Sequence, residues 1–165
     1  MRRCTVDTNV PIVANGRPDT SHGGKVATVD CQIAAIEFLQ SVMKTGLVLL
    51  DVDGAIQAEY HRHLHPRGQP GVGDRFYLEI LNSAPGRVER SELPKREDGE
   101  YAHLPQALID TNFDPNDRKF AALAAKEGIP VINTTDSDWL NHRAILSDVG
   151  VQVEFLCGCD ETKWF

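Results

Sequence analysis

Short, β-branched apolar runs separated by longer segments of helical periodicity constrain the fold of this chain more than any other feature. The clearest run covers residues 129–132 (IPVI), and similar runs cover residues 3–7, 47–50 and 151–156. Runs of this length and composition are typical of strands. Strands separated by helices require crossover connections, which favour parallel pairing. The sequence therefore predicts an α/β fold, a three-layer α/β/α arrangement with a mainly parallel central sheet.

The segments between these runs carry helix start and stop signals. The predicted helices cover residues 26–45, 55–64, 74–81, 114–127 and 137–149. In the fourth helix Asp114 fits the N-cap and Pro115 the first helical position. Residues 14–24 are expected to form a loop. Residues 82–112 have the weakest pattern, and we expect a charged, solvated excursion there, within a variable helical and loop region at about residues 66–112.

The length of 165 residues suits one domain that spans residues 1–165. No apolar run approaches the roughly 18 residues of a membrane helix. The N-terminus also lacks the apolar segment of a signal peptide, so we expect a cytoplasmic protein without a membrane partner. The four cysteines show no paired metal-binding spacing, so we expect reduced thiols and no zinc site.

The net charge of −7 argues against a protein that coats nucleic acid, because such proteins are basic overall. It is compatible with an enzyme that holds nucleic acid through metal ions and a local basic patch. Acidic residues gathered in one pocket would themselves make the total charge negative.

Acidic side chains directly follow two of the predicted strands. Asp7 ends the first strand, and Asp136 and Asp138 follow the run at residues 129–132. Ligands of open α/β sheets bind at the carboxyl ends of the strands. Neighbouring carboxylates repel each other, and a bound cation relieves that repulsion. A purely structural role remains an alternative for either Asp136 or Asp138, because Asp is also a good helix N-cap.

Two further acids have ordinary structural explanations when each is taken alone. Glu59 can be a solvated residue of the helix at residues 55–64, and Asp117 suits the dipole of a first helical turn. If these helices meet the same sheet edge, both acids join Asp7 and Asp136 in one pocket. Carboxylates in such a pocket are suitable ligands for Mg²⁺ or Mn²⁺. Two such ions support phosphodiester cleavage by activating water and stabilising the leaving oxygen.

Four motifs in this order resemble those of the PIN-domain nucleases. They are residues 6–9 (VDTN), 58–60 (AEY), 117–124 (DRKFAALA) and 134–139 (TTDSDW). Their order and rough spacing agree with that family from residue 5 to about residue 156. The stretch after Glu59 is longer than in compact members, which leaves the choice of substrate open.

The resemblance implies a metal-dependent endonuclease that acts on RNA more often than on DNA. In many small members it implies a toxin restrained by an antitoxin, and dimers are common among similar proteins. One or two Mg²⁺ or Mn²⁺ ions would be held by acidic side chains, namely Asp7, Glu59, Asp117, Asp136 and, in an assisting role, Asp138. Water activated at the metal would attack phosphorus and leave a 5′-phosphate and a 3′-hydroxyl.

Other polar residues near these motifs are expected to support the site. Candidates to orient the carboxylates by hydrogen bonds are Thr8, Asn9 and Thr134. Candidates to contact phosphates are the cations Arg62, Arg67, Arg118 and Lys119, of which the last two neighbour Asp117.

Two other functions remain as alternatives. Residues 47–54 (LVLLDVDG) resemble the first motif of haloacid-dehalogenase-like phosphatases, with Asp51 as nucleophile and Asp53 as acid and base. A second matching motif at residues 71–74 (GVGD) follows too soon to leave room for the intervening strands. The third possibility is a Rossmann-like module that binds Mg²⁺ without cleaving anything. Replacement of one acid distinguishes an enzyme from such a module.

Overall fold

The structure of the protein is a computed structural model. It describes residues 1–18, 23–82, 85–158, 161 and 164. No helix among these residues is long and apolar enough to cross a membrane.

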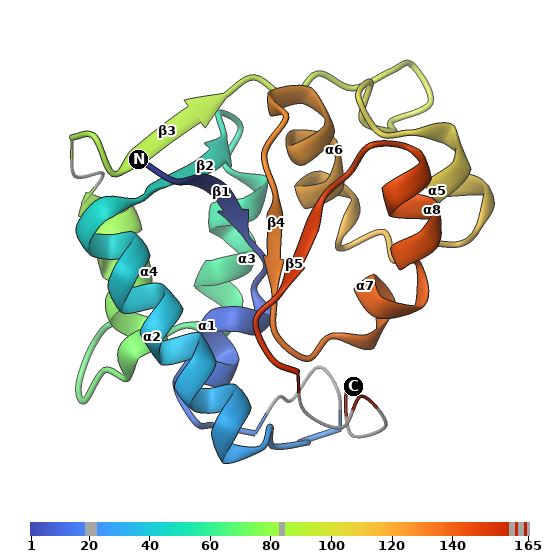
Figure 1. Ribbon diagram of the computed structural model, residues 1–165. Helices are drawn as coiled ribbons and strands as arrows, with labels where there is room; N and C mark the ends of the chain where they lie inside the picture. The colour runs from blue at the N-terminus through green and yellow to red at the C-terminus, as the bar shows by residue number, and fades with distance from the viewer. Residues whose placement is uncertain (19–22, 83–84, 159–160, 162–163, 165) are drawn as a thin grey trace.

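Five parallel strands form one sheet in the order β3-β2-β1-β4-β5 (Figure 1). The central strand β1 (Arg3–Val6) pairs with β2 (Leu47–Asp51) on one side and β4 (Val131–Asn133) on the other. The outer strands are β3 (Val88–Ser91) and β5 (Val153–Phe155). The predicted α/β fold with a parallel sheet is therefore confirmed.

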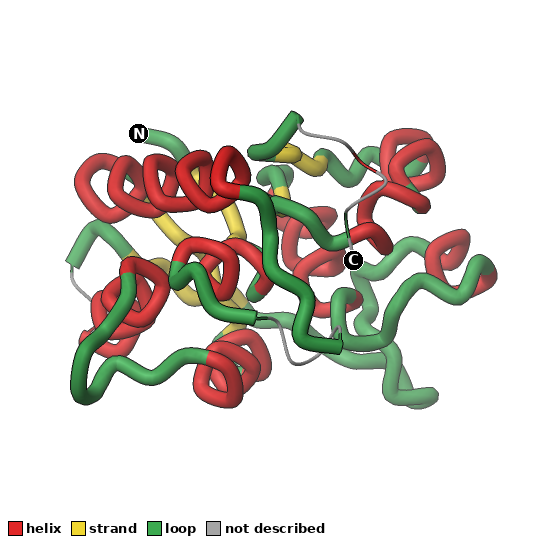
Figure 2. Tube along the Cα trace, turned by 90° about the horizontal axis from the view of Figure 1, so that it is seen from below, coloured by secondary structure: helices red, strands yellow, loops and turns green. Residues whose placement is uncertain are grey.

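Helices cover both faces of this sheet, which gives the expected three layers (Figure 2). They are α1 (Asn9–Ala14), α2 (Val29–Thr45), α3 (Ala55–His63), α4 (Val72–Asn82), α5 (Gln106–Asp110), α6 (Arg118–Glu127), α7 (Ser137–Asn141) and α8 (Arg143–Asp148). Helix α6 packs against β1, β2 and β4. Its buried alanines, such as Ala121 and Ala124, have small side chains that permit this close approach.

Three elements, α1, β3 and α5, were not expected from the sequence. Helix α1 begins three residues after β1, and it accommodates Pro11 because the first turn of a helix needs no partner for that N–H. The stretch expected to be a solvated excursion contributes β3 and α5. Strand β3 is hard to recognise because it lies at the sheet edge and carries the charged residues Glu89 and Arg90.

The first three predicted helices differ from the structure by one to three residues at their ends, and the other two differ more. The fourth begins at Arg118 rather than at Pro115, because a turn precedes it in which Asp114 Oδ1 accepts the Asn116 N–H at 2.8 Å. The segment predicted as one helix at residues 137–149 divides into α7 and α8 at His142.

The expectation of reduced thiols is wrong for one pair of cysteines. Cys31, in the first turn of α2, forms a disulfide with Cys157, which follows β5, and their Cα atoms lie 5.1 Å apart. Cys4 is a buried free thiol in β1. Cys159 lies outside the described residues. The disulfide ties the start of α2 to the end of the sheet across 126 residues of sequence.

Candidate functional site

The carboxyl ends of β1 and β4 form the switch point of this sheet. From β1 the chain adds β2 and β3 on one side, and it then adds β4 and β5 on the other. Helices that leave neighbouring strands in opposite directions open a crevice at such a point, where ligands of α/β proteins bind. Asp7 follows β1 directly, and Asp136 lies three residues after β4.

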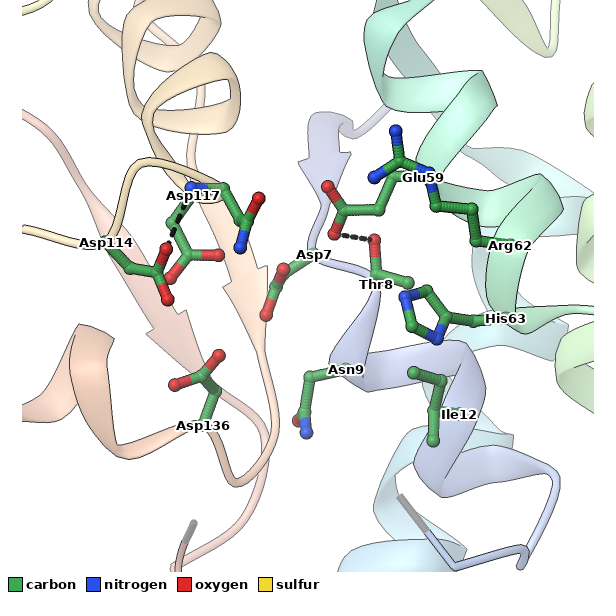
Figure 3. Close-up of a pocket in the computed structure, with 11 residues that line it drawn as sticks. Asp7, Thr8, Asn9, Ile12, Glu59, Arg62, His63, Asp114, Asp117 and Asp136 are labelled. Carbon is green, nitrogen blue, oxygen red and sulfur yellow. Dashed lines mark hydrogen bonds between the residues drawn. The ribbon is translucent and has the colours of Figure 1, made fainter. Parts of the chain in front are cut away.

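A pocket of about 190 Å³ lies at this edge (Figure 3). Its lining residues are Asp7, Thr8, Asn9, Ile12, Glu59, Arg62, His63, Asp114, Asn116, Asp117 and Asp136. The four predicted acids Asp7, Glu59, Asp117 and Asp136 therefore come together although they lie up to 129 positions apart in the sequence. Figure 3 shows Asp114, Asp117 and Asp136 on one side of the pocket, Glu59 and Arg62 on the other, and Asp7 between them.

Asp7 and Asp117 are buried in this pocket without full hydrogen bonding. They are 2% and 5% exposed, and the Oδ2 atom of each has no hydrogen-bond partner in the described part of the chain. Burial raises the pKa of Asp7 well above its usual range, and the nearby charges of Asp136 and Glu59 raise it further. Burial and then the charge of Asp7 raise the pKa of Asp117 in the same direction. A buried carboxylate without partners is costly, and a bound cation removes that cost.

Asp136 has a structural role as well as a place in the pocket. Its Oδ1 atom accepts the Asp138 N–H at 2.9 Å, so it is the N-cap of α7, and the cap interpretation is confirmed for this residue. The side chain of Asn133 bonds to both the N–H and the carbonyl of Asp136. These contacts fix the loop that presents the Asp136 carboxylate to the pocket.

Asp138 does not line the pocket. Its Oδ2 atom accepts the Asp114 N–H at 2.9 Å, and its Oδ1 atom lies 3.1 Å from His142 Nδ1. Partial burial lowers the pKa of His142, but hydrogen bonds to the carbonyls of Asp138 and Thr111 outweigh that effect and raise it. Asp138 therefore anchors the turn before α6, which carries Asp114 and Asp117 into the pocket.

Glu59 enters the pocket from α3. Tyr60, the next residue, is buried and donates its hydroxyl hydrogen bond to the Val6 carbonyl, which fixes α3 against the end of β1. Glu59 Oε1 accepts a hydrogen bond from the Thr8 hydroxyl at 2.7 Å. Glu59 Oε2 forms an ion pair with Lys119 Nζ. The explanation of Glu59 as a fully solvated helix residue is thus excluded, because its side chain is only 12% exposed.

The residues expected to orient the carboxylates differ in their contacts. Thr8 bonds to Glu59 as described above, whereas Asn9 Oδ1 accepts the Thr135 N–H at 2.9 Å. Asn9 thereby ties the start of α1 to the loop after β4. Thr134 is fully buried, and its hydroxyl has no hydrogen-bond partner among the described residues.

The four expected phosphate contacts also divide into two groups. Arg62 lines the pocket and is exposed, and Arg67 is exposed but lies outside the pocket lining. Arg118 pairs with Glu100 and donates to the Phe113 carbonyl at 3.1 Å. The side chain of Lys119 is 9% exposed and pairs with Glu59. Arg62 is therefore the best placed of the four to meet a phosphate that enters from solvent.

Sequence reasoning missed three polar residues that line the pocket, namely His63, Asp114 and Asn116. Asp114 was interpreted as a helix N-cap, and no local pattern indicates that a turn brings it to the pocket. His63 belongs to a run of three histidines and two arginines at residues 61–67, a composition that is typical of an exposed surface. The approach of α3 to α6, together with the hydrogen bond from the Asp114 N–H to Asp138, brings these residues to the same pocket.

The pocket has donors that fit a hard divalent cation. Its acidic side chains offer only oxygen, as Mg²⁺ and Mn²⁺ prefer. The unpartnered Oδ2 atoms of Asp7 and Asp117 supply two buried ligands. As the side chains stand, no three His, Cys, Asp or Glu residues of the described chain converge on one metal position. Binding would therefore need side-chain rotations that bring these oxygens together.

The alternative pair Asp51 and Asp53 has a different environment. Asp51 is buried, and its two oxygens accept the N–H groups of Ala55 and Ile56 at 2.7 and 2.9 Å. This is how a carboxylate caps the start of a helix, here α3. Asp53 is exposed. The arrangement gives the phosphatase alternative no support, because the nucleophile it requires is engaged by backbone donors.

Comparisons with models of protein families, with curated proteins and with solved structures found no match to this chain. The geometry of the pocket is therefore the basis for assigning a function.

Proposed function

We propose that the protein is a PIN-like, metal-dependent nuclease that hydrolyses phosphodiester bonds, in RNA rather than DNA. One observation carries this proposal. Two buried aspartates, Asp7 and Asp117, leave an oxygen without a partner in an acidic pocket at the switch point of a parallel sheet. Such a pocket is unfavourable unless a cation binds there. A divalent cation among carboxylates is the usual device for phosphodiester hydrolysis.

Three aspartates would hold the cation, namely Asp7, Asp117 and Asp136. When bound, Mg²⁺ or Mn²⁺ supplies positive charge for the reacting phosphate and lowers the pKa of water. The chain itself buries the carboxylates of Asp7 and Asp117, and Asn133 and Asn9 fix the backbone of the loop that carries Asp136. Arg62 and His63 lie where a phosphate would enter the pocket.

In the proposed reaction a water oxygen forms a bond to phosphorus, and the bond between phosphorus and the 3′-oxygen breaks. The products are a 5′-phosphate and a 3′-hydroxyl, and the leaving oxygen takes up a proton. The net charge of −7 weakens binding to long polyanions at physiological salt. A short or structured RNA segment is therefore the proposed substrate.

A toxin role restrained by an antitoxin and a homodimer remain part of the proposal. We also propose that the protein acts in the cytoplasm, where RNA substrates are available. Disulfides are rare in reducing cytoplasm. The proposed location therefore requires the fold to persist when the Cys31–Cys157 bond is reduced.

A cleavage assay tests the proposal. Purified protein is mixed with labelled single-stranded RNA, transfer RNA and single-stranded DNA, each with Mn²⁺, Mg²⁺ or EDTA. We expect metal-dependent cleavage of RNA that falls at least about 100-fold in Asp136→Asn. The exposed Asp53→Asn is the matched control and keeps the wild-type rate. Equal cleavage by wild type and Asp136→Asn overturns the proposal. Release of phosphate from a small phosphoester that is lost in Asp51→Asn favours the phosphatase instead.

A further inference from the structure

Lys119 is a buried cation that lies behind the pocket lining and contacts the lining residue Glu59. The residue is 7% exposed, although lysine is among the residues that proteins bury least. Its ammonium group pairs with Glu59 Oε2 and donates to the Asn116 carbonyl. Its charge also acts on Asp7. A buried lysine needs such partners, because an ammonium loses its hydration there.

The contacts of Lys119 complete the environment of Glu59. One carboxylate oxygen accepts the Thr8 hydroxyl, and the other faces the ammonium of Lys119. Any metal ion that takes Glu59 as a ligand must displace this lysine or compete with its charge. The Glu59 side of the pocket therefore already holds one positive charge supplied by the chain.

The aspartate side of the pocket is different. Asp7 and Asp117 each keep one buried oxygen without a hydrogen-bond partner among the described residues. Glu59 is thus paired with the side-chain cation Lys119. The Oδ2 atoms of Asp7 and Asp117 have no such partner among the described residues. This asymmetry divides the pocket into a lysine-neutralised half and a half that requires a cation from solution.

We propose that Lys119 takes the place of a second metal ion, so that the pocket binds a single divalent cation through Asp7, Asp117 and Asp136. This inference rests on the proposed function and specifies which cations neutralise the acidic side chains of that site. Glu59 is then a positioning residue that holds the ammonium beside the metal-binding half. The positive charge of Lys119 limits the number of metal ions that the pocket can bind, because an ammonium group repels a second divalent cation beside it.

Calorimetric titration of metal-free protein with Mn²⁺ tests the inference without measuring activity. For wild type we expect one Mn²⁺ per chain, with binding weakened at least about 100-fold in Asp7→Asn. In Glu59→Gln the affinity should fall less than about tenfold, because Glu59 is not a ligand of that ion. Lys119→Met keeps the side-chain length, removes the charge and should bind a second Mn²⁺. Lys126→Met is the matched control with unchanged stoichiometry, because Lys126 lies on the same helix but contacts Ser91, Glu92 and Glu127 rather than Glu59.

Lys119→Met leaves the Glu59 carboxylate without its counter-charge, so circular dichroism must show that the variant is folded. The double variant Lys119→Met/Glu59→Gln removes both charges and should return to one Mn²⁺. Two ions in wild type, or an affinity loss in Glu59→Gln as large as in Asp7→Asn, overturns the inference while leaving the nuclease proposal intact. Binding of Mn²⁺ that does not depend on Asp7 overturns both.

Discussion

The Thr8 hydroxyl donates a hydrogen bond of 2.7 Å to Glu59 Oε1 and so connects the end of β1 to α3 across 51 positions of sequence. Thr8 is 3% exposed, so water cannot readily replace this contact. Together with the Lys119 ion pair, it fixes the Glu59 carboxylate from two directions. The pocket is therefore organised by contacts between side chains as well as by the backbone.

Thr8→Val tests that hydrogen bond, because valine has a similar shape and no hydroxyl. Loss of a group that orients an active-site carboxylate typically lowers activity or metal affinity about 10- to 100-fold. We expect a fall of that size in the rate of RNA cleavage. Thr45→Val is the control, since the Thr45 hydroxyl donates to the Ser41 carbonyl at an exposed position of α2 and Thr45 does not line the pocket. A wild-type rate in Thr8→Val contradicts the role assigned to this contact.

The stability of the metal-free protein should decrease as the pH rises. The folded-state pKa values of Asp7 and Asp117 are raised, mainly by burial. Such groups contribute stability that is full below their unfolded pKa, about 4, and that is lost as pH rises through the folded value. The raised pKa of His142 acts in the same direction at higher pH. We therefore expect the Tm in EDTA to fall between pH 5 and pH 8.

Asp7→Asn should raise the Tm in EDTA at pH 8 and reduce this pH dependence. The substitution removes a buried charge and its repulsion with Asp136 and Glu59. Asp53→Asn removes a charge at an exposed position and should keep the wild-type slope. Thermal unfolding followed by circular dichroism at several pH values measures both. A wild-type slope in Asp7→Asn would show that Asp7 is not a buried, repelled carboxylate.

The interior of the sheet could be predicted from the sequence because its residues carry a local signal. The apolar runs around β1, β2 and β4 identify strands, and the acids that follow β1 and β4 identify the pocket edge. Strand β3 could not be identified because an edge strand exposes charged side chains such as Glu89 and Arg90. Residues Asp114 and Lys119 join the site through the approach of α3 and α6, which no local pattern records.

The disulfide was missed for a related reason. Cys31 and Cys157 are 126 positions apart, and that spacing carries no recognised pairing signal. Cross-links stabilise a fold by restricting the unfolded chain, typically by about 2–4 kcal/mol and by about 5 kcal/mol for loops of this length in the chain-entropy model. Urea unfolding of oxidised and reduced protein should therefore differ by about 2–5 kcal/mol.

Cys31→Ala is the control for this measurement. It lacks the cross-link in both conditions, so adding a reductant should not lower its unfolding free energy further. Equal stability of oxidised and reduced wild type would mean that the bond does not form or does not restrict the unfolded chain. A cooperative transition in the reduced protein is required by the proposed cytoplasmic location.

Gly73 is required where α4 crosses α1. A Cβ atom at this position would lie 1.9 Å from the Pro11 carbonyl oxygen, and that oxygen belongs to the backbone. The helices must separate to admit it, so Gly73→Ala should lower the unfolding free energy by about 2 kcal/mol or more. Gly158→Ala is the matched control, because a Cβ there meets nothing within 4 Å. Equal urea midpoints for the two variants would contradict this close contact.

The most direct test of the account is single-turnover cleavage of a labelled RNA with Mn²⁺ by wild type, Asp7→Asn and Asp53→Asn. We predict products with 5′-phosphate and 3′-hydroxyl ends for wild type and Asp53→Asn, and at least about 100-fold slower cleavage for Asp7→Asn. Cleavage by folded Asp7→Asn at the wild-type rate, or wild-type cleavage that persists in EDTA, would contradict a metal-dependent nuclease site at this pocket.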